Sequence, residues 1–236
     1  MASPTLANII AAIRAMIPNI TSTQYSDANV TICLEQALRR LNRDKPRKVT
    51  ALVTGDGGNF YQATTVLTSW VEDWSIIEKV IQNSPTIANE EEINHLNRRG
   101  FEVYHDGTNE QIRFDKSFGS SDTVTVTYTA KHTVNGVDGE TADTIPSKYE
   151  NAVEFLTATI VCYALAAQAA GNIDSALPGD LIDWRSKNRE YTNQGKTFEG
   201  QYEKELGMSE VVAAGVARND FEPTLSGGAA RMTHRR

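Results

Sequence analysis

The chain has 236 residues, of which 40% are hydrophobic and 22% are charged, and its formal net charge at pH 7 is -7. This length is enough for one large domain or two small ones, and the composition excludes a globally disordered chain. Residues 47–146 account for most of the acidity, with 8 Lys and Arg against 15 Asp and Glu. An acidic chain is poorly suited to clamp nucleic acid, because such binding comes largely from basic side chains that neutralise phosphates.

The cysteine content and the apolar segments indicate the cellular compartment in which the protein is expected. The two cysteines, Cys33 and Cys162, lie in helical patterns among apolar neighbours. A secreted disulfide scaffold has a far higher cysteine density, so we expect a reducing compartment. The sequence starts without the basic stretch of a secretory signal, and the most apolar run, Ala158–Ala170, is shorter than a membrane-spanning helix requires. We therefore expect a cytoplasmic protein with no membrane segment.

Two amphipathic helices are predicted at the start of the chain. Pro4 fits the first turn of the first helix, with Ser3 as its N-cap, and Pro18 ends this helix. Ser26 is the expected cap of the second helix, which ends before Pro46. Apolar side chains at spacings of three and four give each helix one buried face. They are Leu6, Ile9, Ile10, Ile13 and Ile17 in the first helix, and Val30, Leu34, Ala37, Leu38 and Leu41 in the second.

The middle of the chain is rich in β-branched residues, aromatic residues and glycine turns, which predicts a small antiparallel sandwich or barrel. A Gly-rich turn at Gly55–Gly58 is expected to join the first strand to a partner strand, and Asp106-Gly107 to turn a second hairpin. The polar stretch Glu90–Arg99 predicts a short helix or a loop. The predicted strands are 48–53, 60–61, 74–81, 101–104, 111–114 and 124–128.

Two further helices are predicted after a Gly- and Asp-rich linker at Asn135–Asp143. The first begins at Pro146 and runs to about residue 170, and the second runs from near Pro178 to Leu206. Gly207 is a natural C-terminal stop for the last helix. The apolar face of the first of these helices is marked by Tyr149, Val153, Leu156, Ile160, Tyr163 and Ala164.

Neither helical pair can cover its own apolar face. We therefore predict an α+β protein in which residues 1–46 and 146–207 form one four-helix unit, with Leu34, Leu38, Leu41, Leu156 and Ile160 buried. Residues 47–145 would form an inserted antiparallel β domain. Residues 208–236 have little apolar surface to bury, so we expect a flexible tail that becomes ordered on assembly. The expected anchor of this tail to a partner or a neighbouring subunit consists of Phe221, Leu225, Arg231, Arg235 and Arg236.

The sequence offers little that would support catalysis. It contains no nucleotide-binding loop, zinc-protease motif, nucleophile elbow or paired CxxC motif, and no histidine is spaced from another His or Cys as metal ligands are. Glu90–Glu92 fits a solvated face better than a catalytic carboxylate site. Trp70, Trp74 and Trp184 fit core or interface packing better than a platform for a sugar or a base. We expect neither an enzyme nor a bound cofactor or metal.

The order of elements resembles the head-to-tail adaptor proteins of tailed bacteriophages, also called connector, neck or gatekeeper proteins. This resemblance covers residues 4 to about 207, and the large β insertion looks most like that of podovirus tail adaptors. The segments that carry it are Tyr25-Ser26-Asp27, Ala37–Asn42, Ile145–Glu150, the Ala-rich helix that follows, and a long polar helix with Tyr191, Phe198 and Tyr202.

The resemblance implies a virion structural protein of the neck or tail, assembled in the host cytoplasm, with no catalytic residues. It implies a homo-oligomeric ring, commonly a dodecamer, that binds the portal protein and presents a platform for tail or nozzle proteins. DNA would pass through the channel without specific binding during ejection, since an acidic wall repels phosphates. Three other interpretations stay open: a tail-tube or tail-completion protein, a ligand- or carbohydrate-binding module on the β domain that uses Trp70 and Trp74, and an enzyme with an unrecognised carboxylate site.

Overall fold

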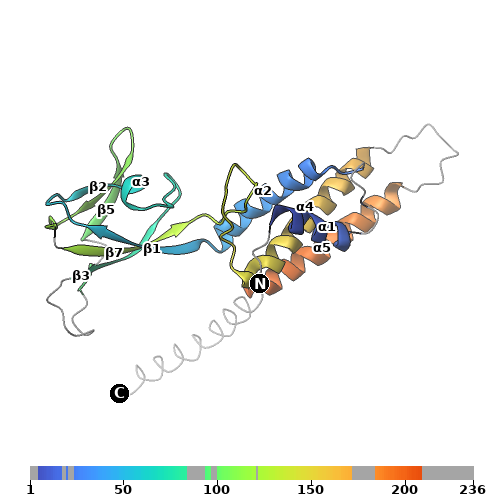
Figure 1. The fold of residues 1–236 in the computed structure, drawn as a ribbon. Helices are drawn as coiled ribbons and strands as arrows, with labels where there is room; N and C mark the ends of the chain where they lie inside the picture. Colours follow the sequence, from blue (N-terminus) through green and yellow to red (C-terminus); the bar gives the residue numbers. More distant parts are fainter. Residues whose placement is uncertain are drawn as a thin grey trace, which may run out of the picture. The chain divides into compact units, whose positions relative to one another are not determined.

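A computed structural model describes residues 5–17, 20, 24–83, 94–96, 100–120, 122–171 and 184–208. Its contacts divide the chain into two compact units (Figure 1). The helical unit combines residues up to Arg40 with residues from Thr133 onward, and the β-rich unit comprises Leu41–His132. The mixture of helices with antiparallel sheets confirms the α+β class.

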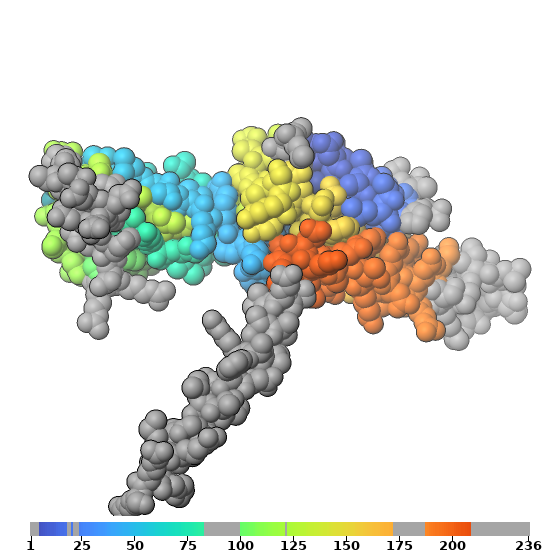
Figure 2. Space-filling view, turned by 90° about the horizontal axis from the view of Figure 1, so that it is seen from below, coloured from blue at the N-terminus to red at the C-terminus, as the bar shows by residue number. Residues whose placement is uncertain are grey.

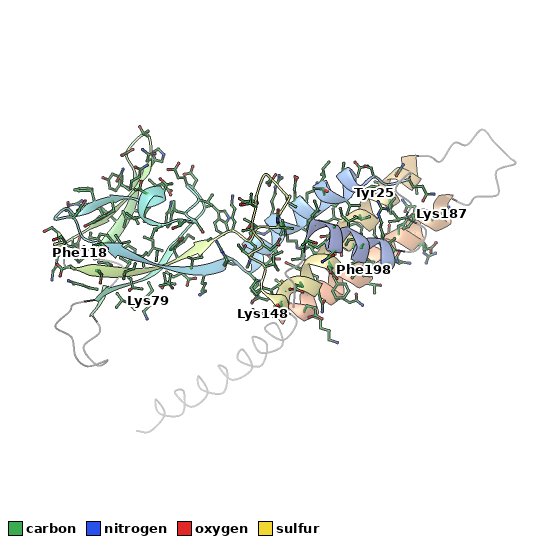
Figure 3. The ribbon with its side chains drawn as sticks, in the orientation of Figure 1. Tyr25, Lys79, Phe118, Lys148, Lys187 and Phe198 are labelled. Atoms are coloured by element: carbon green, nitrogen blue, oxygen red, sulfur yellow. The ribbon has the colours of Figure 1, made fainter. Side chains whose placement is uncertain are left out.

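Most of the helical structure belongs to the helical unit. Its helices are α1 (Leu6–Met16), α2 (Asp27–Asp44, which continues past Arg40 into the β-rich unit), α4 (Glu150–Gly171) and α5 (Trp184–Glu205), and a 3-10 turn, η2 (Ser147–Tyr149), precedes α4. α4 and α5 pack against each other in antiparallel orientation. The ring of Phe155 stacks on that of Phe198, labelled in Figure 3, with centroids 6.3 Å apart. Further along the pair, Asn188 Nδ2 donates a hydrogen bond to the Ala166 carbonyl at 2.7 Å.

The first two helices begin at capping side chains. Ser26 Oγ accepts a hydrogen bond from the Asn29 amide at 3.3 Å, which confirms the predicted cap of α2. The cap predicted for α1, Ser3, is wrong. α1 is capped by Thr5, which is extended (φ -77, ψ 154) and accepts a hydrogen bond from the Asn8 amide at 3.4 Å. A helix capped two residues earlier would need helical torsions at this threonine.

The end of α5 agrees with the prediction. Gly207 has φ +67, in the left-handed region that favours glycine, and its amide donates to the Lys204 carbonyl at 3.0 Å. The predicted start near Pro178 lies outside the described residues.

Burial on α4 differs from the predicted face. Leu34, Leu38, Leu41 and Leu156 are buried as predicted, whereas Ile160 is only half-buried. Small residues on several sides of α4 are buried instead: Ala152, Thr157, Ala158, Thr159, Cys162, Ala166 and Ala169. Small side chains let neighbouring helices approach closely, so the contact surface of α4 is wider than its stripe of large residues.

The helix Ser147–Gly171 is long and apolar enough to cross a membrane by length and composition, contrary to the expectation from the sequence. Within the described chain, 61% of its most apolar window is buried. The core helix of a soluble protein passes the same test, so this property is weak evidence for a membrane span.

The segment predicted as a linker is a folded loop of the helical unit. The Thr133 amide donates to Thr144 Oγ1 at 2.7 Å, and the Thr144 amide donates to the Thr133 carbonyl at 3.0 Å, which closes the base of the loop. Val134 and Val137 inside the loop are buried. These two valines supply core contacts that the surrounding Gly and Asp residues concealed in the sequence.

The β-rich unit contains two antiparallel sheets, ordered β1-β7-β3-β4 and β2-β6-β5. The strands are β1 (Arg47–Thr54), β2 (Phe60–Gln62), β3 (Ile77–Asn83), β4 (Asn94–Leu96), β5 (Phe101–His105), β6 (Glu110–Phe114) and β7 (Thr123–Ala130), and a short helix, α3 (Ala63–Val66), follows β2. The segment predicted to be a helix or loop, Glu90–Arg99, contains strand β4. The strand predicted from Trp74 begins only at Ile77, because a turn that includes Asp73 at φ +59 precedes it.

The Gly-rich segment after β1 connects the two sheets and is not a hairpin turn between paired strands. β1 pairs with β7, whereas β2 pairs with β6. At Gly55 a Cβ atom would lie 2.3 Å from the Gly119 carbonyl oxygen, so only glycine allows this close approach of the backbone.

The core of the β-rich unit draws side chains from both sheets. Val80, Val126 and Tyr128 of one sheet and Ile112 and Phe114 of the other are buried in one cluster. Phe118, labelled in Figure 3, follows β6 in the chain and is also buried in this cluster; its ring packs edge-on against Phe114, with centroids 5.1 Å apart.

Candidate functional site

The described residues contain no candidate metal centre. Among them, no group of three or more His, Cys, Asp or Glu side chains could hold a metal ion. His132 is buried, with Nε2 3.0 Å from the Lys45 carbonyl oxygen, and its amide donates to Asn42 Oδ1 at 2.6 Å. His132 therefore has a structural role where the chain enters and leaves the β-rich unit. The acidic run Glu90–Glu92 lies outside the described residues.

Acidic oxygens at the β5–β6 turn are engaged with the backbone. Asp106 Oδ1 accepts hydrogen bonds from the Thr108 and Asn109 amides, both at 2.8 Å, and Gly107 has φ +99. The amides hold the pKa of the Asp106 carboxyl below its usual value, because they stabilise the charged form. The predicted Asp106-Gly107 turn is confirmed.

The two tryptophans whose side chains are described, Trp70 and Trp74, do not form an exposed aromatic platform. Trp70 is buried, and its Nε1 donates a hydrogen bond to Glu110 Oε2 at 2.6 Å. Trp74 is half-buried, with Lys131 Nζ 5.7 Å from its ring centroid. The side chain of Trp184 lies outside the described residues. Trp70 thus packs in the core, as the sequence favoured.

A polar cluster connects three helices of the helical unit, and sequence reasoning missed it. Arg40 of α2 contacts Glu199 of α5 with 2.7 Å between Nη1 and Oε1, and its guanidinium lies over the Tyr202 ring at 5.3 Å. The Tyr163 hydroxyl of α4 donates to the other carboxylate oxygen of Glu199 at 3.0 Å. Arg40 is the main cause that holds the pKa of Glu199 below its usual value. No local pattern could have revealed this cluster, since Arg40 is 159 residues from Glu199.

The same region has a close contact between two helices. Gly195 of α5 lies against the Tyr163 ring, where an added Cβ would be 2.8 Å from Cε1. α5 covers much of one face of the helical unit (Figure 2). The hydrogen bond from the Tyr163 hydroxyl to Glu199 holds the ring in place at this contact.

A shallow groove of about 560 Å³ lies beside α1 in the helical unit. Leu6, Ile10 and Ala11 supply its apolar wall, and Asn135 lines it from the folded loop. Arg14, which also lines the groove, forms an ion pair with Asp27. The groove is open and has no paired acid–base groups beyond this ion pair.

Exposed aromatic side chains gather on the outer face of the β2-β6-β5 sheet. Phe60, 50% exposed, and Tyr104, 37% exposed, meet edge to face with ring centroids 6.2 Å apart. The Arg113 guanidinium lies 5.7 Å from the Phe60 ring centroid and pairs with Glu102 at 2.9 Å. Large exposed apolar groups beside a charge pair are typical of a protein–protein contact surface.

The predicted anchor residues lie outside the described residues. They are Phe221, Leu225, Arg231, Arg235 and Arg236, and the described chain ends at Met208. Leu206 is the last buried residue before this point.

No protein-family model matches this chain, and no curated protein matches it.

Proposed function

We propose that this chain is a virion structural protein of a tailed bacteriophage, a head-to-tail adaptor that forms a ring beneath the portal. The observation that supports this most is the composition of the helical unit, which joins residues up to Arg40 with residues from Thr133 onward around a β-rich insertion. The resemblance to adaptor proteins rests on this same order of elements.

In this proposal α1, α2, α4 and α5 form one four-helix core, and the two sheets pack together as a sandwich or partly open barrel. The contacts of α4 with α1 and α5, and the ion pair between Arg40 and Glu199, support the helical core. The buried cluster that draws on both sheets supports the packing of one sheet against the other.

In this role the protein acts by assembly, without catalysis or a cofactor. It joins the portal protein to tail or nozzle proteins as a homo-oligomeric ring, a dodecamer in most adaptors. DNA passes through the channel without specific binding, and the acidic excess of residues 47–146 suits a wall that phosphates do not adhere to. The protein would lie in the neck or tail of the virion, after assembly in the host cytoplasm.

The anchor of this ring to the portal is assigned in the proposal to residues 208–236. Truncation after Gly207 tests it, because Leu206 and the C-terminal stop of α5 are retained. The shortened chain should keep its thermal stability and helical circular dichroism, and should lose co-sedimentation with the portal protein of the same phage. A full-length variant with the three terminal arginines replaced by glutamine is the matched control, since it separates their charge from the apolar anchors Phe221 and Leu225. Portal binding by the truncated chain at full strength would contradict the anchor assignment.

A further inference from the structure

The two sheets of the β-rich unit end in four edge strands, which are β1 and β4 in one sheet and β2 and β5 in the other. β1 and β5, with 8 and 5 residues, are the longer edge of each sheet, whereas β2 and β4 have 3 residues each. An edge strand presents a row of unpaired N–H and C=O groups, which is a template for pairing with another chain.

On β5, the free row is formed by alternate residues. The Asp115 amide donates to the Gly100 carbonyl, and in an antiparallel ladder the hydrogen-bonded pairs recur at every second residue. Glu102 and Tyr104 therefore bond to β6, and the intervening residues direct their backbone groups outward. These outward residues are Phe101, Val103 and His105, and no hydrogen bond satisfies their backbone groups in the described chain.

β1 has the same property over a longer stretch. The Gly55 amide donates to the Asp122 carbonyl, so Val53, Ala51 and Val49 bond to β7. The outward residues are Lys48, Thr50, Leu52 and Thr54, and their backbone groups also lack a partner within the described residues.

Exposed apolar side chains lie on both edges. Leu52 of β1 is 60% exposed, and Val103 and Tyr104 of β5 are 39% and 37% exposed. Both strands carry β-branched or aromatic residues and no proline. Neither edge has an inward-pointing charge along Val49–Val53 or Phe101–His105 that would repel an added strand.

We propose that β1 of one copy pairs in parallel with β5 of the neighbouring copy, which rests on the homo-oligomeric ring of the proposed function. In a parallel pair, each outward residue of one strand bonds to the two residues that flank its neighbour on the other strand. Thr50 can then stand beside Glu102 and Leu52 beside Tyr104, and about six backbone hydrogen bonds form.

This register matches the two faces of the strands. Leu52 and Tyr104 both lie on outer faces and become lateral neighbours. On the inner faces, apolar residues meet apolar residues: Val49 with Phe101, and Ala51 with Val103. In an antiparallel pairing of β1 with β5, the residues whose backbone groups point away from their own sheets would stand opposite one another. On β1 these residues carry their side chains on the outer face, whereas on β5 they carry them on the inner face. Leu52 would then share a face with Val103, and outer side chains would be mixed with inner ones.

A second copy is the occupant because the two edges are different and complementary. Contacts between two different surfaces are head-to-tail contacts, which close into a ring when the rotation allows. Antiparallel pairing of β1 with β1, or of β5 with β5, also matches faces, but it closes a two-fold dimer and leaves the other edge free.

Cysteine pairs at the centre of the proposed contact distinguish these arrangements. Ala51→Cys chains are mixed with Val103→Cys chains of the full-length protein, and disulfide formation is followed under mild oxidation. The native thiols give no background, since Cys33 and Cys162 are buried and burial raises the pKa of Cys162 to about 12. The mixture should form heterodisulfides about tenfold or more faster than a control mixture in which Ile76→Cys chains replace one of the two variants. The reason is that strand pairing raises the effective concentration of the thiols.

Ile76 is 65% exposed and lies outside both edge strands, so it controls for simple accessibility. Leu52→Cys mixed with Tyr104→Cys repeats the test on the outer face, in case the Ala51 variant does not fold. Disulfides formed by Ala51→Cys alone or by Val103→Cys alone would indicate homotypic pairing and overturn the proposal, as would heterodisulfides at the control rate. If the chain still forms rings on the portal in that case, only the edge pairing is wrong. If no copies associate on the portal at all, the proposed function fails as well.

Discussion

The contact between Gly195 and Tyr163 predicts that two glycines of one helix respond oppositely to alanine. Gly195 and Gly200 both lie in α5, where alanine is favoured over glycine by about 1 kcal/mol in a helix interior. An added Cβ at Gly200 meets no atom within 4 Å. Gly200→Ala should therefore stabilise the helical unit by ~0.5–1 kcal/mol.

At Gly195 the same Cβ would lie 2.8 Å from Tyr163 Cε1 and 3.1 Å from Cδ1. The ring cannot swing away without losing the hydrogen bond of its hydroxyl to Glu199. Overpacking of this kind costs about 1–3 kcal/mol, which offsets or exceeds the gain in propensity. Gly195→Ala should thus be about 1–3 kcal/mol less stable than Gly200→Ala.

Urea unfolding followed by helical circular dichroism measures both variants under the same conditions. A cycle in a Tyr163→Ala background isolates the contact, since without the ring Gly195→Ala should stabilise as Gly200→Ala does. If Gly195→Ala stabilises the protein in the presence of Tyr163, the ring moves aside freely and the close approach of α4 and α5 does not depend on glycine.

Three further changes should have measurable effects. Leu38→Asp places an unpaired charge at a position only 6% exposed and should unfold the helical unit, so a normal helical spectrum would refute the burial argument. Arg40→Ala removes the ion pair with Glu199 and should lower the free energy of unfolding by ~1 kcal/mol at neutral pH. Because the folded pKa of Glu199 is lowered, this contribution is present above the unfolded pKa and is lost as pH falls through the folded value, so wild-type and variant stabilities should converge in acid. Asn42→Ala removes the side-chain acceptor of the buried His132 amide and should lower the free energy of unfolding by about 1–3 kcal/mol in chemical denaturation, whereas a neutral result would mean that water replaces the bond.

The sequence predicted what depends on neighbours in the chain. Apolar spacing placed α2 and its buried leucines, Ser26 and Gly207 marked helix ends, and Asp106-Gly107 marked a turn. Each of these features is decided within a few residues by propensity, capping or backbone torsion.

Features that depend on distant partners escaped prediction. β1 pairs with β7, with Val53 opposite Val124, and the Gly-rich segment after β1 suggested a local hairpin in place of that distant partner. Ile160 has the spacing of a buried residue, but the small residues of α4 decide which sides its neighbours cover. The cluster of Arg40, Tyr163 and Glu199 likewise exists only once three helices are packed.

The candidate contact surfaces show the same division. Exposed Leu52 and Tyr104 could be read as strand residues, but their place on sheet edges follows only from the strand order. The predicted anchor residues between Phe221 and Arg236 lie outside the described residues and stay a prediction.

Native mass spectrometry of the full-length chain, alone and mixed with the portal protein of the same phage, tests the proposed function most directly. The adaptor role predicts complexes in which a closed set of copies, a dodecamer in most adaptors, is bound to one portal ring, with weaker self-association in the chain alone. A chain that stays monomeric and leaves the portal ring unoccupied at high concentration would contradict it.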